Sequence, residues 1–188
     1  MHNAVVQQIV SVFNQRGSEN YGIEPVTQLE HAIQSAELAK RSGAASSLIV
    51  AALLHDIGHI LGNHPLPDGQ SKNYDDKHET SAYGWLREHF GQRVADPVRL
   101  HVAAKRYLCT VDPSYCDQLS PTSLKSFHDQ GGVMSAEEKA AFEKEAYFEE
   151  ALRLRRWDDA AKDPDAEIPA IDEFADLLLE VMSGKSKP

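Results

Sequence analysis

Residues 50–60 read VAALLHDIGHI, an apolar segment that carries His55, Asp56 and His59 and contains no Lys or Arg. An unpaired carboxylate or imidazole is costly to bury beside leucine and isoleucine side chains, so these polar groups need partners. A metal ion would satisfy both kinds of group at once. Because successive residues on a helix diverge by about 100°, other helices must complete the ligand set around His55 and Asp56.

Further candidate ligands occur before and after this segment, at His31, His78, His101 and Asp158. Together the six nitrogen and oxygen donors exceed the needs of one tetrahedral zinc, but they suit two octahedral ions that share a carboxylate. We assign the shared carboxylate to Asp56. The lack of sulfur donors favours iron, manganese or another borderline-to-hard metal. Since a lone histidine is more often a core or surface residue, we expect no metal ligand among four further histidines. These are His2, His64, His89 and His128.

Apolar residues recur at helical spacing along nearly the whole chain, and no sheet pattern competes, so the sequence predicts an all-α fold. Capping boxes begin at Thr27 and Ser135, and Pro97 and Pro121 are expected at first helical positions. The expected helices cover 3–16, 27–42, 46–61, 76–90, 96–107, 121–128, 135–143, 145–161 and 169–181, which leaves 62–75, 108–120 and 129–134 irregular. Residues 1–183 are expected to form one domain, with 184–188 as a frayed tail.

The composition is that of a soluble globular protein, with 41% apolar and 26% charged residues. The formal net charge of -10 opposes binding to nucleic acid or anionic membranes, because both need clustered Lys and Arg. Cys109 and Cys116 form no CxxC pair, so we expect no disulfide scaffold. We find neither a membrane-spanning run nor the basic start of a signal peptide, and we expect a cytoplasmic protein. The sequence leaves the oligomeric state open.

The six candidate ligands occur in the order H…HD…H…H…D, which resembles the pattern of the HD-domain superfamily. This resemblance implies a helical bundle with a dinuclear metal site in its core. Most members hydrolyse phosphate esters with a metal-bound water, whereas a smaller branch keeps two irons and activates dioxygen. The chain is similar to the phosphonate-cleaving oxygenases of that smaller branch. The matching segments are YGIEPVTQLEH, AALLHDIGH, HVAAKRYL, LSPTS, DQGGVM and EEALRLRRWDD, within residues 21–159.

The closer resemblance implies two irons in the mixed-valent Fe(II)/Fe(III) state, with O2 as co-substrate. The substrate it implies is a small 1-hydroxy-2-aminoethylphosphonate, either as the primary amine or in its N-trimethylated form. Cleavage of the carbon-phosphorus bond would then give glycine or glycine betaine plus phosphate. The sequence does not distinguish between the two nitrogen groups.

The same resemblance assigns catalytic and substrate-binding residues. Tyr21 and Glu24 match a pair that covers the irons until substrate binds, and His59, four residues after His55, is expected beside the metal-bound groups. The phosphonate site maps onto Lys105, Ser123, Gln130 and Arg155. Helical spacing supports two of these residues independently. Lys105 lies four residues after His101, so both are expected on one face of their helix. Arg155 lies three residues before Asp158, with the same consequence.

Alternative functions remain open. A metal-dependent phosphohydrolase acting on a nucleotide or another phosphate ester would use the same ligands and would not need O2. A sensing or scaffold bundle with a structural metal would leave the surplus donors unexplained, because a structural site closes its shell around one ion. An inositol-type oxygenase of the same superfamily is disfavoured, because the resemblance extends to the phosphonate-binding residues.

Overall fold

The structure is a computed structural model that describes the backbone of residues 2–61 and 78–184 and the side chains of 3–60 and 82–184. The loop expected over 62–75 and the side chains of His64 and His78 lie outside the described residues. Within the described residues, the all-α prediction is confirmed. The β-type pairing found there is one isolated bridge, between Asn20 and Thr27. No helix among the described residues has the length and apolar character needed to cross a bilayer.

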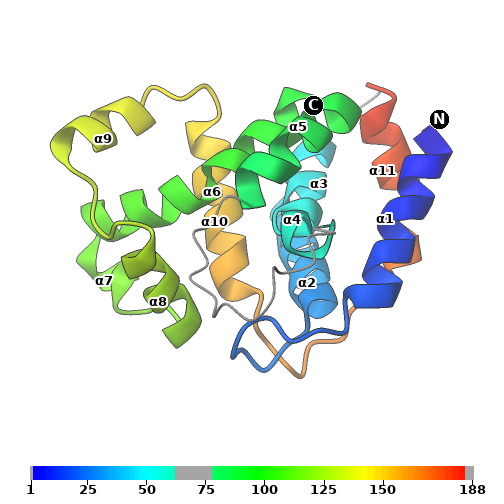
Figure 1. Cartoon of the computed structure of the whole chain (residues 1–188), viewed down its shortest axis with the longest axis horizontal. Coiled ribbons are helices and arrows are strands. Elements are labelled where there is room, and N and C mark those ends of the chain that lie inside the picture. The colour runs from blue at the N-terminus through cyan, green and yellow to red at the C-terminus, as the bar shows by residue number, and fades with distance from the viewer. Residues whose placement is uncertain (1, 62–77, 185–188) are drawn as a thin grey trace, which may run out of the picture.

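Figure 1 shows the order and arrangement of the helices. They are α1 (His2–Arg16), α2 (Gln28–Arg41), α3 (Ser46–Leu54), α4 (Ile57–Leu61), α5 (His78–Phe90), α6 (Gln92–Val111), α7 (Pro113–Cys116), α8 (Pro121–Asp129), α9 (Ala136–Phe142), α10 (Phe148–Ala160), a 3-10 turn η1 (Ile171–Phe174) and α11 (Ala175–Met182). Helices α1 and α11 pack together at one end of the molecule, and α7, α8 and α9 lie at the other (Figure 1).

Helix α3 forms the centre of the main core, since every residue from Ser47 to Leu54 is buried. Helices α2, α6, α10 and α11 pack against it. A second apolar cluster joins α6 and α10 to α9, and it includes Leu100, Ala104, Phe142 and Ala151. Because α2, α3, α6 and α10 are packed against one another, polar side chains on their facing surfaces are brought together inside the bundle.

The expected helix over 46–61 is wrong in one respect, because it is interrupted at His55 and Asp56 and continues as α4. In an unbroken helix these neighbouring side chains would diverge by about 100°. The break lets both side chains approach one point in the bundle. The interruption therefore lies where the buried polar groups need shared partners.

The first-position assignment of Pro97 is also wrong, because α6 begins at Gln92 and holds this proline inside the helix. Val94, Ala95 and Val98 are fully buried, so their packing outweighs the backbone hydrogen bond that proline cannot donate. The irregular stretch expected over 108–120 is partly helical, since it contains the end of α6 and all of α7.

Local capping signals predicted three other helix starts well. The boxes at Thr27 and Ser135 are both formed, with Glu30 and Glu138 as their carboxylate partners. Pro121 stands in the first turn of α8, after the cap residue Ser120.

Candidate metal centre and substrate cavity

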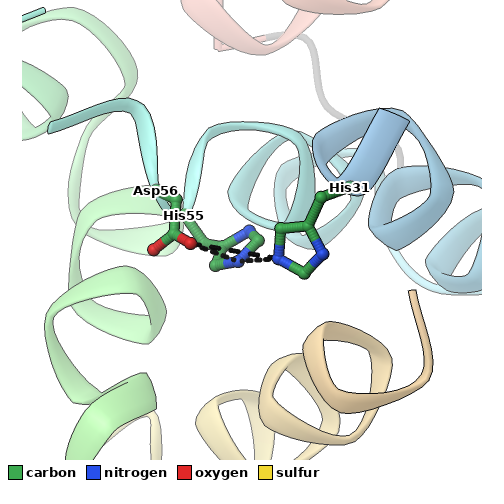
Figure 2. A group of neighbouring side chains, drawn as sticks. All are labelled: His31, His55 and Asp56. Carbon is green, nitrogen blue, oxygen red and sulfur yellow. Dashed lines mark hydrogen bonds and ion pairs between the residues drawn. The ribbon is translucent and has the colours of Figure 1, made fainter. Parts of the chain in front are cut away.

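His31, His55 and Asp56 bring their ligand atoms to one point between α2 and the break after α3 (Figure 2). The two Nε2 atoms of the histidines are 3.1 Å apart. Asp56 Oδ2 lies 3.4 Å from Nε2 of His55 and 3.9 Å from Nε2 of His31. One atom from each residue lies within 4.8 Å of the others, which is the spacing of ligands around one ion.

Three buried histidines are oriented by their own backbone surroundings. Each Nδ1–H donates to a main-chain carbonyl, with distances of 2.9 Å from His31 to Ala161, 2.9 Å from His55 to Ala52 and 2.6 Å from His101 to Val98. A carbonyl only accepts hydrogen bonds, so Nδ1 must carry the proton. Nε2 of each ring is therefore the nitrogen through which it can bind a metal.

Asp56 lies between two groups of imidazoles. Its Oδ2 faces His31 and His55, while its Oδ1 lies 3.7 Å from Nε2 of His101 and 3.8 Å from Nε2 of His59. One carboxylate therefore presents a different oxygen to each group, as a carboxylate that bridges two ions would. His78, the remaining candidate ligand, contributes only backbone to the described residues, at the start of α5.

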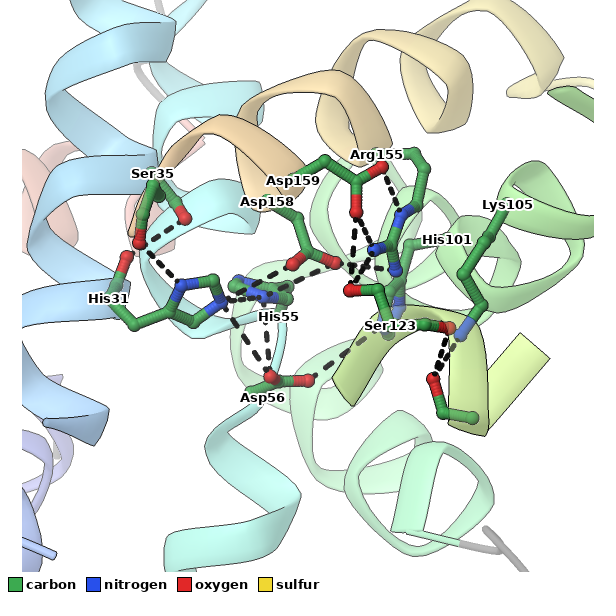
Figure 3. A network of polar contacts seen from close by, with 12 residues as sticks. His31, Ser35, His55, Asp56, His101, Lys105, Ser123, Arg155, Asp158 and Asp159 are labelled. Atoms are coloured by element: carbon green, nitrogen blue, oxygen red, sulfur yellow. Dashed lines mark hydrogen bonds and ion pairs between the residues drawn. The ribbon is translucent and has the colours of Figure 1, made fainter. Parts of the chain in front are cut away.

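Asp158 completes the first group from α10 (Figure 3). Its Oδ1 lies 3.4 Å from Nε2 of His31, and it is buried without a hydrogen-bond partner in the part of the chain that the structure describes. Its Oδ2 forms an ion pair of 2.8 Å with Arg155. A buried carboxylate oxygen without a partner, next to imidazole lone pairs, fits a metal ligand set.

Burial and the charges in this cluster shift the pKa values of its side chains strongly. Burial opposes ionisation of Asp56 and Asp158, but His55 for the first and Arg155 for the second hold each carboxyl pKa well below its usual value. Burial also lowers the pKa of His55, but the two carboxylates outweigh it and raise that pKa to about 9. For His101, burial together with the charge on His55 outweighs Asp56 and lowers the pKa to about 4. Because a pKa of about 9 keeps His55 protonated at neutral pH, a metal ion that binds its Nε2 would displace a proton.

These opposite shifts predict a stability maximum near pH 6.5 for the metal-free protein. The pKa of His55 is raised from 6.5 to about 9, so its contribution is complete below pH 6.5 and is lost as pH rises through 9. The pKa of His101 is lowered from 6.5 to about 4, so its contribution is complete above pH 6.5 and is lost as pH falls through 4. Each loss should be on the order of 3 kcal/mol.

Urea unfolding of chelator-treated protein across this pH range measures both losses. His55→Gln should abolish the alkaline loss and reduce the acidic one, because the charge on His55 helps to lower the pKa of His101. Unfolding free energies that are flat from neutral to alkaline pH would contradict the assignment of a bound proton to His55.

A cavity of about 610 Å³ adjoins the metal centre. Its wall includes Tyr21, His59, Lys105, Ser126, Gln130 and Arg155. Lys105 is only 2% exposed, and its Nζ donates to Ser126 Oγ at 2.5 Å. A buried ammonium beside a cavity provides the positive charge that an anionic substrate requires.

Arg155 is largely engaged by the protein itself (Figure 3). It binds Asp158 through one terminal nitrogen, and Asp159 through Nε at 3.0 Å and through the other terminal nitrogen. Ser123 lies 3.4 Å from that second terminal nitrogen, is buried, and is not among the cavity-lining residues. The structure therefore brings Lys105, Gln130 and Arg155 to the cavity, whereas Ser123 contacts Arg155 without lining the cavity.

Tyr21 and Glu24 occupy different positions. The Tyr21 ring stacks on His31, with centroids 3.8 Å apart and planes 16° apart. Burial and the carboxylates of Asp158 and Asp56 raise the pKa of Tyr21, so its hydroxyl stays protonated. Glu24 accepts a hydrogen bond of 2.5 Å from Ser120 and is not among the cavity-lining residues. Only the tyrosine of this pair therefore lies against the proposed ligands.

Three residues with clear roles in this network were missed by the sequence interpretation. Asp159 holds Arg155, and it accepts a hydrogen bond from the Tyr115 hydroxyl. Lys162 donates to Ser123 Oγ at 2.8 Å. Asp159 follows Arg155 by four residues, which is a helical pairing distance that the sequence did contain. No such local signal identifies Tyr115 or Lys162.

Comparisons with known proteins agree with this architecture. The HD-domain family model matches residues 28–159. The hydroxymethylphosphonate dioxygenase of Gimesia maris is 42% identical over 170 residues, which cover 89% of this chain and 85% of that protein. The glycine-betaine-forming 1-hydroxy-2-(trimethylamino)ethylphosphonate dioxygenase of Leisingera caerulea is 41% identical over 177 residues, covering 93% and 88%. A metal-dependent phosphohydrolase of Cordyceps militaris matches over 73 residues, or 38% of this chain. The chain therefore belongs to the HD-domain family, in the group that contains these two phosphonate dioxygenases.

Proposed function

We propose that this protein is an iron-dependent oxygenase that uses O2 to cleave the carbon-phosphorus bond of a small 1-hydroxyphosphonate and releases phosphate. Its similarity to two phosphonate dioxygenases along 89% and 93% of the chain supports oxygenase chemistry. The observation that carries the proposal is the buried histidine and aspartate cluster, which shares a cavity with the buried ammonium of Lys105. A phosphonate dianion and a metal centre would then meet in one cavity.

Two irons in the mixed-valent state are the proposed cofactors. His31, His55 and Asp158 would hold one iron, His101 and His78 the other, and Asp56 would bridge them. The bound irons would supply the redox chemistry with O2. The chain's own part is to orient the substrate, neutralise its charge and exclude water from the reacting carbon.

The phosphonate end of the substrate is assigned to Lys105, Gln130 and the remaining N–H of Arg155. Lys105 supplies a cation, and Gln130 supplies directional hydrogen bonds from the cavity wall. Ser126, the partner of Lys105, holds that ammonium in place. Ser123 is better assigned to orienting Arg155 than to contacting the substrate, because it is buried, contacts the guanidinium and is not among the cavity-lining residues.

At the nitrogen end of the substrate, the cavity suits a primary ammonium better than a trimethylammonium. Gln28 lines the cavity, and its buried Oε1 has no hydrogen-bond partner among the described residues. A primary ammonium would donate to this oxygen, whereas a trimethylammonium has no N–H and favours aromatic faces. The Tyr21 ring is already stacked on His31 and has Lys162 Nζ 5.7 Å from its centroid. A second cation at this ring would meet like charge.

Phosphate release by the iron-loaded protein, with and without O2, tests the proposed function. The substrates are 2-amino-1-hydroxyethylphosphonate, its N-trimethyl analogue and hydroxymethylphosphonate. We expect release only with O2, and fastest from the primary amine. Oxygen-independent phosphate release from phosphate esters, with none from these three compounds, would support a hydrolase instead.

Gln28→Met should lower kcat/KM for the primary amine by about tenfold, because one hydrogen bond to a charged group is lost. The value for hydroxymethylphosphonate should stay unchanged, since that compound has no nitrogen. The ratio of the two kcat/KM values is therefore the measurement. An equal change for both substrates would remove Gln28 from the nitrogen end.

Lys105→Met should raise KM for the hydroxyphosphonate at least about tenfold, because a buried charge-assisted contact to the phosphonate is lost. The metal content per chain should not change, since Lys105 is not a proposed ligand. Lys139→Met, which removes a partly exposed lysine paired with Glu143, is the matched control. An unchanged KM in Lys105→Met would exclude this lysine from the phosphonate site.

A further inference from the structure

Lys162 joins three segments of the chain close to Tyr21. It follows the end of α10, and its side chain is only 10% exposed. Its Nζ donates to Ser123 Oγ at 2.8 Å and to Ser120 Oγ at 3.0 Å, both at the start of α8. The same Nζ lies 3.6 Å from Glu24 Oε1, on the loop between α1 and α2.

The charges at this junction depend on one another. A cation near the N-terminus of α8 is opposed by the helix dipole, so Lys162 requires a nearby anion. Glu24 supplies that anion and also accepts the hydrogen bond of 2.5 Å from Ser120, the cap residue of α8. Removing either charge would leave the other poorly compensated in a largely buried position.

Short backbone contacts connect Glu24 to Tyr21. The Glu24 N–H donates to the Tyr21 carbonyl at 3.0 Å, and the Tyr21 N–H donates to the Val26 carbonyl at 2.9 Å. Between them, Gly22 has a positive φ of 59°, and a Cβ there would lie 3.0 Å from Thr122 of α8. The turn is thus pressed against α8, and anchoring Glu24 also anchors Tyr21.

We propose that Lys162 is a positioning residue that holds Tyr21 against His31 through Glu24, and so controls the cover over the metal cavity. Lys162 does this without touching the reacting atoms. The Tyr21 ring covers one imidazole of the metal centre, and the Lys162 ammonium lies 5.7 Å from the centroid of that ring. The catalytic consequence rests on the proposed function, whereas the anchoring itself does not.

Hydrogen exchange of the backbone amides in residues 19–26 tests the anchoring in the purified protein. Lys162→Met and Glu24→Gln should each speed exchange of this segment by about tenfold, because a charge-assisted contact is lost. The double variant should be no faster than either single variant. Lys139→Met should leave exchange at the wild-type rate.

Two results would overturn the inference. One is unchanged exchange of residues 19–26 in Lys162→Met. The other is an equal acceleration across α8 and α10, which would make Lys162 a general stabilising residue rather than a residue that positions the loop. Neither result depends on catalysis, so both are distinct from a failure of the proposed function.

Steady-state kinetics on the iron-loaded protein provide a second readout. Lys162→Met should lower KM for the hydroxyphosphonate several-fold and should change kcat less, because a looser cover competes less with substrate entry. A loss of kcat at constant KM would contradict a positioning role. If the wild type releases no phosphate from any hydroxyphosphonate, the proposed function fails while the exchange result still decides the anchoring.

Discussion

Asp56→Ala should lose both metal ions together and should show no oxygen-dependent phosphate release. The two oxygens of Asp56 face different groups of imidazoles, with His31 and His55 on one side and His101 on the other. Losing a contact outside the ligand shell costs about 10–100-fold in metal affinity, so losing a shared ligand should cost at least ~100-fold at each ion. Elemental analysis of metal per chain measures the effect.

The matched control for this prediction is Asp176→Ala, which removes an exposed carboxylate of α11. That variant should keep the metal content and activity of the wild type. Retention of two ions per chain in Asp56→Ala would exclude the bridge, and retention of one ion would assign Asp56 to a single group of ligands.

Arg155→Met should lower the free energy of unfolding of the metal-free protein by about 3–5 kcal/mol, because removing one partner leaves buried charges uncompensated. The carboxylates left behind belong to Asp158, which is 1% exposed at its side chain, and to Asp159, which is 16% exposed. This loss is large against the roughly 5–15 kcal/mol that stabilises a typical domain. Urea unfolding after chelator treatment measures it without a contribution from bound metal.

Arg153→Met, on the same helix, tests whether the effect is specific to the buried position. Arg153 is exposed and lies 5.2 Å from the Trp157 ring, so its loss should cost less than about 1 kcal/mol. Arg155→Lys keeps a positive charge and should recover part of the stability. A loss below about 1 kcal/mol in Arg155→Met would show that the two carboxylates find other partners.

The sequence predicted the helices well where the signal is local. The capping boxes at Thr27 and Ser135 satisfy backbone N–H groups within one turn, so their residue types alone mark a helix start. The all-α class follows from apolar spacing, which the chain repeats over nearly its whole length. Pro97 and the break at His55 and Asp56 were not predictable in this way, because packing between distant helices overrides the local preference.

For the candidate site, the sequence by itself determined which residues were suited to the chemistry. His55 and Asp56 in an apolar segment required partners, and the spacing of Lys105 from His101 predicted a shared face. Only the tertiary structure decided which residues actually meet. It brought Tyr21 onto His31 and turned Glu24 to Ser120, 96 positions along the chain. It also paired Tyr115 with Asp159 and Lys162 with Ser123, because contacts between remote segments depend on how helices pack and not on local spacing.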